Sequence, residues 1–311
     1  MQVWRSLSEL PAFPGRAVVT IGNFDGVHIG HRYLFDDVCA RAAAVEASAI
    51  VLTFDPHPVH LLAPDRELKL LTPMPERLRL FAESNLDGVL ILRFDAELAA
   101  MPAQDFVQQI LVDRLRVCEI LVGHDFRFGF RAVGNVDLLR EMGAQHDFRM
   151  TPVTPLQSRG KTVSSTRIRK LIAAGSVAAA ARLLGRHYAV VGPIATGRGI
   201  GGRETVPTLN LAPYPELLPL RGVYVTRTEC NGWSGRSVTN IGRNPTMGET
   251  ELHLESHYLD TPPLGWVHGE EMRVTFLFRI REEIKFPSVE ALRERIGRDI
   301  RLARKYFARQ R

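Results

Sequence analysis

Residues 22–31 read Gly-Asn-Phe-Asp-Gly-Val-His-Ile-Gly-His and directly follow the apolar run Ala17–Ile21. The run has the length and composition of a buried strand, and a helical pattern begins at about Arg32. A glycine-bearing turn between a strand and a helix presents backbone N–H groups and the positive end of the helix dipole, which suits a phosphate group. This stretch therefore predicts a strand, a phosphate-binding turn and a helix in succession.

Two histidines, His28 and His31, stand in this turn. Imidazole can donate hydrogen bonds to phosphate oxygens, and the neighbouring glycines let a nucleotide approach the backbone closely. A nucleotidyl transferase acting on the α-phosphorus of ATP must hold charge on those oxygens rather than supply a covalent nucleophile. Ordinary turn histidines or half of a metal site are the alternatives, but no pair of cysteines has zinc-ligand spacing. The preceding strand and the Asn-Phe-Asp-Gly turn favour a phosphate site.

The composition indicates a soluble globular protein, because 45% of the 311 residues are hydrophobic and 24% are charged. A chain of this length is long enough to form two domains of ordinary size. No run reaches the roughly 18 apolar residues of a transmembrane helix, and the N-terminus has no signal-peptide pattern, so we expect a cytoplasmic protein without a membrane partner. Three widely separated cysteines, Cys39, Cys118 and Cys230, are expected to be free thiols.

The formal net charge of +6 is compatible with an anionic partner. Many basic residues lie between Arg279 and Arg311, where the pattern is that of an amphipathic helix, so we interpret them as a solvated helix face. No zinc-finger spacing or RNA-recognition motif accompanies the charge. We therefore expect nucleotide phosphates rather than nucleic acid.

The first 150 residues alternate between strand and helix patterns. After the first strand, strands are predicted at 48–54, 88–92 and 118–122, and helices at 33–44, 75–83 and 103–115. Repeated strand–helix units imply a parallel sheet with helices on both faces. We therefore predict an α/β fold, in which ligands bind beyond the carboxyl ends of the strands.

Chemistry-bearing residues follow two of these strands. Asp55-Pro56-His57-Pro58 follows the second strand, and the prolines stiffen a turn that presents His57 near the other two histidines. A surface-loop histidine is the alternative. Residues 123–129, Gly-His-Asp-Phe-Arg-Phe-Gly, follow the fourth strand. Phe126 and Phe128 offer stacking faces for a ring system and Arg127 a fork for phosphate or carbonyl oxygens, although both phenylalanines could equally be core residues.

A hydroxyl cluster, Ser164-Ser165-Thr166, begins a further helix. Serine and threonine at a helix start are first of all caps. Here Arg167 and Arg169 follow the cap and can place positive charge on a triphosphate. The segment is therefore a candidate clamp for ATP.

The pattern changes after Gly185, where we place the domain boundary. Short strands with Gly and Pro turns are predicted at 188–191, 222–227, 237–241, 251–259 and 272–278. This spacing predicts a small antiparallel β-barrel. A closing helix at 289–307 carries apolar residues at intervals of three and four, which predicts a packing face.

The barrel region carries the elements of a second phosphate site. A glycine-rich loop at 197–202 can wrap phosphates with its N–H groups, or can be a flexible hairpin. Thr208 and Asn210 offer hard oxygen ligands suited to magnesium. Glu251 and Glu255 share one face of a predicted strand, where a glutamate can serve as a base or simply face solvent.

Taken in order, these motifs resemble the prokaryotic bifunctional riboflavin kinase/FAD synthetase family. The resemblance rests on residues 22–31, 53–58, 123–129 and 164–169 and on the Pro-Thr-x-Asn frame at 207–210. It implies a Rossmann-like nucleotidyltransferase domain at 1–185 that transfers AMP from ATP to FMN. It also implies a riboflavin kinase barrel at 186–311 that phosphorylates riboflavin to FMN.

The resemblance implies residue roles as well. His28, His31 and Glu255 are implied to be catalytic, Glu255 being the glutamate five residues before Asp260. The residues implied to bind ATP in the adenylyltransferase are Gly22, Asn23, Phe24, Asp25, Gly30, Ser164, Ser165, Thr166 and Arg169. Those implied to bind the flavin there are His57, Asp125, Phe126, Arg127 and Phe128. Those implied to bind ATP in the kinase are Gly197, Gly199, Gly201, Thr208 and Asn210, of which Thr208 and Asn210 would be metal ligands.

The kinase loop departs from the family pattern, since Thr205-Val206 replaces Gly-Phe and Leu209 replaces Ala. An enzyme limited to FMN adenylylation is therefore one alternative, and a basic nucleic-acid-binding protein on the same scaffold is a remote second. Both implied reactions use Mg²⁺ with ATP as co-substrate, and riboflavin, FMN and FAD are substrates or products. No oligomeric state is predicted.

Overall fold

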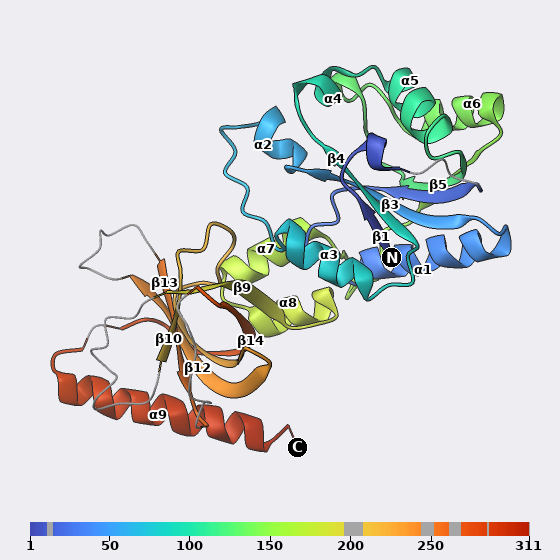
Figure 1. The fold of residues 1–311 in the computed structure, drawn as a ribbon. Coiled ribbons are helices and arrows are strands. Elements are labelled where there is room, and N and C mark those ends of the chain that lie inside the picture. Colours follow the sequence, from blue (N-terminus) through green and yellow to red (C-terminus); the bar gives the residue numbers. More distant parts are fainter. Residues whose placement is uncertain (11–14, 196–207, 244–251, 261–268, 285, 311) are drawn as a thin grey trace. The chain divides into compact units, whose positions relative to one another are not determined.

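The computed structural model describes residues 1–10, 15–195, 208–243, 252–260, 269–284 and 286–310 (Figure 1). The chain divides into two compact units, Met1–Ser165 and Thr166–Arg311. Within the described residues, no helix has the length and apolar character needed to cross a bilayer. The functional boundary placed at residue 185 stays a prediction. The compact units are defined by contacts between residues, whereas that boundary separates two activities.

The first unit is built on a six-stranded parallel sheet with the order β1-β4-β3-β2-β5-β6. The strands are β1 (Gln2–Trp4), β2 (Ala17–Ile21), β3 (Ser48–Asp55), β4 (Gly88–Arg93), β5 (Val117–Gly123) and β6 (Arg149–Val153). The predicted parallel sheet is thus confirmed. The chain moves outward from β2 through β3 and β4, and later from β5 to β6 on the other side, so the strand order reverses between β2 and β5. Such a reversal places a ligand crevice at the carboxyl ends of those two strands.

Helices cover both faces of this sheet, as predicted (Figure 1). They are α1 (Ile29–Ala44), α2 (Pro58–Leu62), α3 (Met74–Ala82), α4 (Ala96–Ala100), α5 (Ala103–Asp105), the π-helical turn η2 (Phe106–Val112) and α6 (Val136–His146), with short 3₁₀ turns η1 (Leu7–Glu9) and η3 (Phe130–Ala132). A two-stranded ribbon, β7 (Gln157–Ser158) and β8 (Lys161–Thr162), precedes the next helix. In Figure 1, α1 and α3 lie on one face and α4, α5 and α6 on the other.

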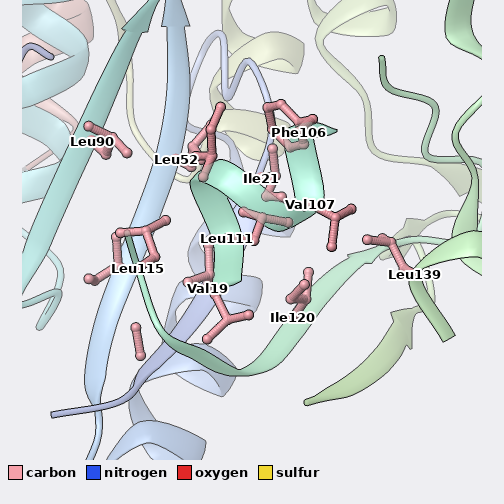
Figure 2. Close-up of a cluster of buried hydrophobic side chains, with 14 of the residues drawn as sticks. Val19, Ile21, Leu52, Leu90, Phe106, Val107, Leu111, Leu115, Ile120 and Leu139 are labelled. Atoms are coloured by element: carbon pink, nitrogen blue, oxygen red, sulfur yellow. The ribbon is translucent and has the colours of Figure 1, made fainter. Parts of the chain in front are cut away.

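The two faces of β2 belong to two different cores, which explains why its sequence is apolar without alternation. Val19 and Ile21 pack in a cluster with Phe106 and Leu139, drawn in Figure 2. Val18 packs on the opposite face in a cluster that includes residues of α1 and α3. Burial of each such aliphatic side chain contributes about 1.5–3 kcal/mol. The strand that precedes the histidine turn is therefore anchored on both of its faces.

The second unit is a closed barrel with the strand order β10-β13-β12-β11-β14-β9, which confirms the predicted antiparallel barrel. Its elements are α7 (Ser165–Ala173), α8 (Val177–Leu184), β9 (Tyr188–Ala195), β10 (Thr208–Leu211), β11 (Gly222–Cys230), β12 (Trp233–Arg243), β13 (Leu252–Tyr258), β14 (Glu271–Arg281) and α9 (Val289–Ala308). Ala303 and Phe307 of α9 pack on Val223 and Val225 of β11, so the closing helix has the expected packing face.

The barrel interior contains a cluster of hydroxyl groups rather than apolar side chains alone. Thr226, Thr228, Ser237, Thr239 and Ser256 are all fully buried. Their oxygens lie 2.6–2.9 Å apart in a connected network. Buried hydroxyls of this kind satisfy one another's hydrogen-bonding capacity.

Several elements differ from the sequence expectation. The stretch 103–115, expected as one helix, begins as α5 and continues as the π-helical turn η2. The edge strands β1 and β6 were not expected: β1 is only three residues long, and β6 contains Pro152, which an edge strand tolerates. Thr208 and Asn210, expected at the end of a loop, form strand β10 between β9 and β13.

Candidate functional site

The turn after β2 contains a cluster of unusual backbone conformations at the switch point of the sheet. Phe24, Gly26 and Val27 have φ values of 48°, 87° and 38°. Phe24 and Val27 are both buried, and the ring of Phe24 meets Phe35 edge-on at a centroid distance of 5.1 Å. Packing thus maintains a conformation that costs roughly 1–3 kcal/mol per residue. Gly22 is needed beneath it, because a Cβ there would lie 3.0 Å from the Phe24 ring.

His28 is the N-cap of α1. Its Nδ1 accepts a hydrogen bond from the backbone N–H of His31 at 3.3 Å. A neutral imidazole whose Nδ1 accepts carries its proton on Nε2, so His28 can donate from Nε2 to a phosphate oxygen. The cap also explains why α1 begins at Ile29, three residues earlier than the sequence pattern predicted.

The two histidines of the turn form a stacked pair. The ring centroids of His28 and His31 lie 3.5 Å apart with an interplanar angle of 20°, and Phe24 meets His31 edge-on at 5.2 Å. A Cβ on Gly30 would come within 3.2 Å of the His28 ring. The glycine between the histidines therefore leaves room for the His28 ring, in addition to any role in binding nucleotide.

Asp25 lies in the turn but points away from solvent. Its carboxylate, 2% exposed, accepts hydrogen bonds from the backbone N–H groups of Leu71 and Thr72 at 2.9–3.0 Å and from the Thr72 hydroxyl at 3.2 Å. Its backbone carbonyl accepts from the Ser165 hydroxyl at 2.8 Å. The carboxylate thus holds residues 71–72, and the assignment of Asp25 to ATP stays a prediction.

Arg77 is a residue that sequence reasoning missed. Its side chain on α3 is buried, and its guanidinium donates to the backbone carbonyls of Asn23 at 2.9 Å and Thr72 at 3.2 Å. The carbonyl of Asn23 is therefore used within the protein. The sequence predicted only a helix at 75–83, and no local signal distinguishes the buried Arg77 from its charged neighbours Glu76 and Arg79.

His57 follows the carboxyl end of β3, the strand beside β2. It is buried and caps α2, and its Nδ1 accepts from the N–H of Val59 at 3.2 Å. Because its Nδ1 accepts a hydrogen bond, a neutral His57 carries its proton on Nε2, as His28 does. Because β2 and β3 are parallel neighbours, both histidine donors belong to the same edge of the sheet.

The segment after β5 is partly core and partly accessible. Phe128 is buried against Phe106 at a centroid distance of 5.6 Å, and Phe126 stacks on Phe128 at 5.5 Å. Asp125 and Arg127 are exposed. Phe128 is therefore a core residue. Phe126 is half-buried, so part of its ring is accessible to a ligand.

The serine segment is divided between the two compact units. Ser164 and Ser165 belong to the first, where the Ser165 hydroxyl contacts the histidine turn through the carbonyl of Asp25. Thr166 and Arg169 lie on α7 in the second unit.

The second candidate site is a row of polar side chains on the outer face of the barrel. Leu209 and Leu211 of β10 are buried, so Thr208 and Asn210 project to the opposite face. Asn210 lies directly opposite Glu255 of β13, and Glu255 lies opposite Asn240 of β12. The barrel thus brings the predicted metal ligand and the predicted base together in one row. Gly197, Gly199, Gly201 and Glu251 lie outside the described residues.

His257 is a second residue that sequence reasoning missed. It pairs with Thr208 across β10 and β13, and it shares a strand face with Glu255 two residues earlier. Burial lowers the pKa of His257, and the nearby charge of Glu255 opposes that shift. The two-residue spacing in Glu255-Ser256-His257 was the available signal, because alternate residues of a strand share a face.

A histidine turn at the switch point of a parallel sheet, followed by a barrel with a Thr, Asn and Glu row, defines a nucleotidyltransferase domain joined to a kinase barrel. Two family models match these parts: FAD synthetase over residues 10–167 and riboflavin kinase over residues 184–307. The chain belongs to the family of bifunctional riboflavin kinase/FMN adenylyltransferases.

Individual relatives match along the whole chain. It is 35% identical to the bifunctional riboflavin kinase/FMN adenylyltransferase of Escherichia coli K12 (99% of this chain, 98% of the relative). It is also 35% identical to that of Pseudomonas fluorescens (98% and 97%). A solved structure from Streptococcus pneumoniae, titled a macrolide-efflux protein, is 28% identical, with a TM-score of 0.86 over 97% of this chain and 98% of that one. The two-unit architecture is thus shared over nearly the full length of these proteins.

Proposed function

We propose that this chain makes flavin cofactors in two ATP-dependent steps. The barrel phosphorylates riboflavin to FMN, and the sheet domain transfers AMP from ATP to FMN, which gives FAD and pyrophosphate. The observation that carries the proposal is the presence of both sites in one chain: the stacked His28–His31 pair at the switch point and the Asn210–Glu255 row on the barrel. A chain limited to adenylylation would have no need of the second row.

In adenylyl transfer, an FMN phosphate oxygen attacks the α-phosphorus of ATP and the bond to the β-phosphate bridging oxygen breaks. Negative charge increases on the oxygens of the α-phosphate and of the departing pyrophosphate. His28 donates from Nε2 to this charge, and the N-terminus of α1 presents its N–H groups to it. His57 and Phe126, which follow β3 and β5, are proposed to contact the flavin.

In riboflavin phosphorylation, the terminal ribityl hydroxyl attacks the γ-phosphorus of ATP and ADP departs. Glu255 accepts the hydroxyl proton, so its carboxylate must remain ionised beside the acceptor. Asn210 and Asn240 lie on either side of Glu255 and can hold it in position by hydrogen bonds. The reaction needs no covalent intermediate on the protein.

Mg²⁺ is the proposed metal of both reactions. Thr208 and Asn210 alternate on one strand and share a face, and their hydroxyl and amide oxygens are hard ligands that fit Mg²⁺. Among the described residues no three His, Cys, Asp or Glu side chains are grouped to hold a metal ion. Mg²⁺ is commonly bound by one or two protein oxygen ligands together with substrate phosphates. When bound, Mg²⁺ offsets the negative charge of the polyphosphate.

The proposed partners are small molecules: riboflavin, FMN and ATP. We propose a cytoplasmic location and no nucleic-acid or membrane partner. The homologous enzymes are named riboflavin kinase/FMN adenylyltransferase, which supports the flavin substrates.

Purified protein incubated with riboflavin, ATP and Mg²⁺ and analysed by chromatography tests the proposal. We expect FMN to form first with one ADP per FMN, then FAD with one pyrophosphate per FAD, and both to stop when EDTA removes the metal. If supplied FMN becomes FAD but riboflavin yields no FMN, the enzyme is limited to adenylylation. If no flavin turns over but RNA binds tightly and in a salt-sensitive manner, the nucleic-acid alternative is correct.

A further inference from the structure

We propose that Arg77 is a positioning residue for adenylyl transfer, which together with Asp25 forms a buried clasp that fixes the histidine turn. The inference rests on the adenylyl transfer proposed above and goes beyond it, because Arg77 reaches the reacting groups only through the backbone. The clasp consists of Asp25, Thr72 and Arg77.

The clasp joins two segments that lie far apart in sequence. The Arg77 guanidinium donates to the carbonyl of Asn23, 54 residues away, at 2.9 Å, and to the carbonyl of Thr72 at 3.2 Å. From the other side, the carboxylate of Asp25 accepts from the N–H groups of Leu71 and Thr72. The Thr72 hydroxyl in turn accepts from the N–H of Gly26 at 2.8 Å. Three residues of the turn, Asn23, Asp25 and Gly26, are therefore linked to residues 71–72 or to Arg77.

Burial makes these links rigid. Arg77 is 1% exposed and Thr72 is 3% exposed. A hydrogen bond between buried groups is not exchanged for one to water, so breaking it leaves an unsatisfied donor or acceptor, and the cost is larger when that group is charged. A buried guanidinium would be a poor choice for filling space alone, since a methionine would fill the same space without a charge to desolvate. Its value lies in two N–H groups held in a fixed fork.

The clasp lies on chain segments that are connected to both histidine donors, His28 and His57, and can therefore fix their positions. His28 follows Asp25 by three residues, across the positive-φ residue Val27. His57 begins α2, and the chain after α2 continues to residues 71–72. The Ser165 hydroxyl also bonds the Asp25 carbonyl. A loss of the Arg77 fork therefore frees a strained turn whose displacement by about 1 Å is enough to slow a reaction a hundredfold.

The test compares Arg77→Met and Arg77→Lys with the matched control Arg79→Met. Arg79 lies on the same helix, but its side chain is 46% exposed and does not reach the histidine turn; it pairs with Glu83, which is 45% exposed, and with the buried Glu76. For each variant, FAD formation from FMN, riboflavin phosphorylation by the same preparation, and thermal unfolding are measured. Because the barrel does not contain the clasp, the kinase reaction serves as an internal control.

We expect Arg77→Met to lower kcat for FAD formation by about a hundredfold, with KM for FMN and ATP within about threefold. Riboflavin phosphorylation should be unchanged. Arg77→Lys should recover part of kcat. Arg79→Met should keep the kcat of the unaltered chain, with a lower unfolding temperature because the buried Glu76 loses its partner. An Arg77→Met variant that keeps kcat, or that loses both activities equally, overturns the proposal.

If Arg77→Met does not fold, Thr72→Val decides instead, because it preserves side-chain shape and removes only the hydroxyl that bonds Gly26 and Asp25. A lower kcat for FAD formation with an unchanged KM supports the clasp, and an unchanged kcat overturns it. If the unaltered chain forms no FAD, the proposed adenylyl transfer fails and the clasp loses its role with it.

Discussion

His28 caps a helix and has a proposed role in adenylyl transfer as well. Serine, threonine, aspartate and asparagine are the preferred N-cap residues, because a short side chain accepts from the first free N–H groups. Histidine caps α1 through Nδ1 and still has Nε2 to donate. An aspartate would cap equally well but would bring a negative charge to the phosphate.

Replacement of His28 by Asn separates these two roles. Asparagine retains an acceptor for the cap, so the free energy of unfolding should change by less than about 1 kcal/mol. The ring donor is lost, so FAD formation from FMN should fall by about a hundredfold or more. Chromatography of flavins and urea unfolding measure the two effects, and unchanged riboflavin phosphorylation by the same preparation is the control. Normal FAD formation would contradict the assignment of His28.

Glu255 provides the reverse test at the barrel. Glutamine keeps the size and the hydrogen bonds of the side chain but cannot accept the hydroxyl proton, so Glu255→Gln should abolish FMN formation from riboflavin. FAD formation from supplied FMN should be spared. An equal loss of both activities would refute the assignment of two separate sites.

At the scale of elements, α9 is held by charge as well as by apolar packing. Asp299 on α9 has a side chain only 3% exposed and pairs with Arg281 of β14 at 2.8 Å and with Arg295 one turn earlier at 3.5 Å. Arg281 is itself 13% exposed. This pair lies beside the apolar contact of Ala303 and Phe307 with the barrel.

Asp299→Asn should therefore destabilise the barrel unit by about 3–5 kcal/mol, because removal of one partner leaves a largely buried charge uncompensated. The matched control is Glu294→Gln on the same helix, whose pair with Arg298 is more than half exposed and should contribute less than about 1 kcal/mol. Urea unfolding followed by circular dichroism measures both. Equal stability of the two variants would show that apolar packing alone holds α9.

Element by element, sequence reasoning succeeded where the pattern is local and strong. Local patterns of apolar residues predicted the bounds of seven strands within a few residues: β2, β3, β4, β5, β11, β12 and β14. The short edge strand β1 and the strand β10 were missed, because their pairing is decided by partners far away in the chain.

At the scale of the whole molecule, the helices α7 and α8 precede the barrel strands in the sequence. From Thr166 onward their residues belong to the same compact unit as the barrel. The family models leave residues 168–183 between them, and this gap contains most of α7 and α8. Ile168, Ile172 and Leu183 are nevertheless buried, and the carbonyl of Ile172 accepts from the N–H of Leu220 in the barrel unit at 3.3 Å. These helices therefore cover part of the barrel.

A fragment of residues 166–311 should accordingly be more stable than one of residues 186–311. The shorter fragment loses the burial of several aliphatic side chains, each contributing about 1.5–3 kcal/mol. Thermal unfolding followed by circular dichroism, with riboflavin phosphorylation as a second readout, compares the two. Equal unfolding temperatures would instead support a boundary at residue 185.

The sequence by itself determined the two-part architecture, the histidine turn and the set of polar residues proposed for the two sites, because strand runs, turn glycines and helix caps are local features. Only the tertiary structure decided what those residues contact. In the folded protein the carboxylate of Asp25 points toward residues 71–72, Arg77 is buried against the carbonyl of Asn23, and Asn210 lies opposite Glu255. Each of these contacts joins segments far apart in the chain, and such pairings depend on the packing of the whole sheet or barrel rather than on the pattern near either residue.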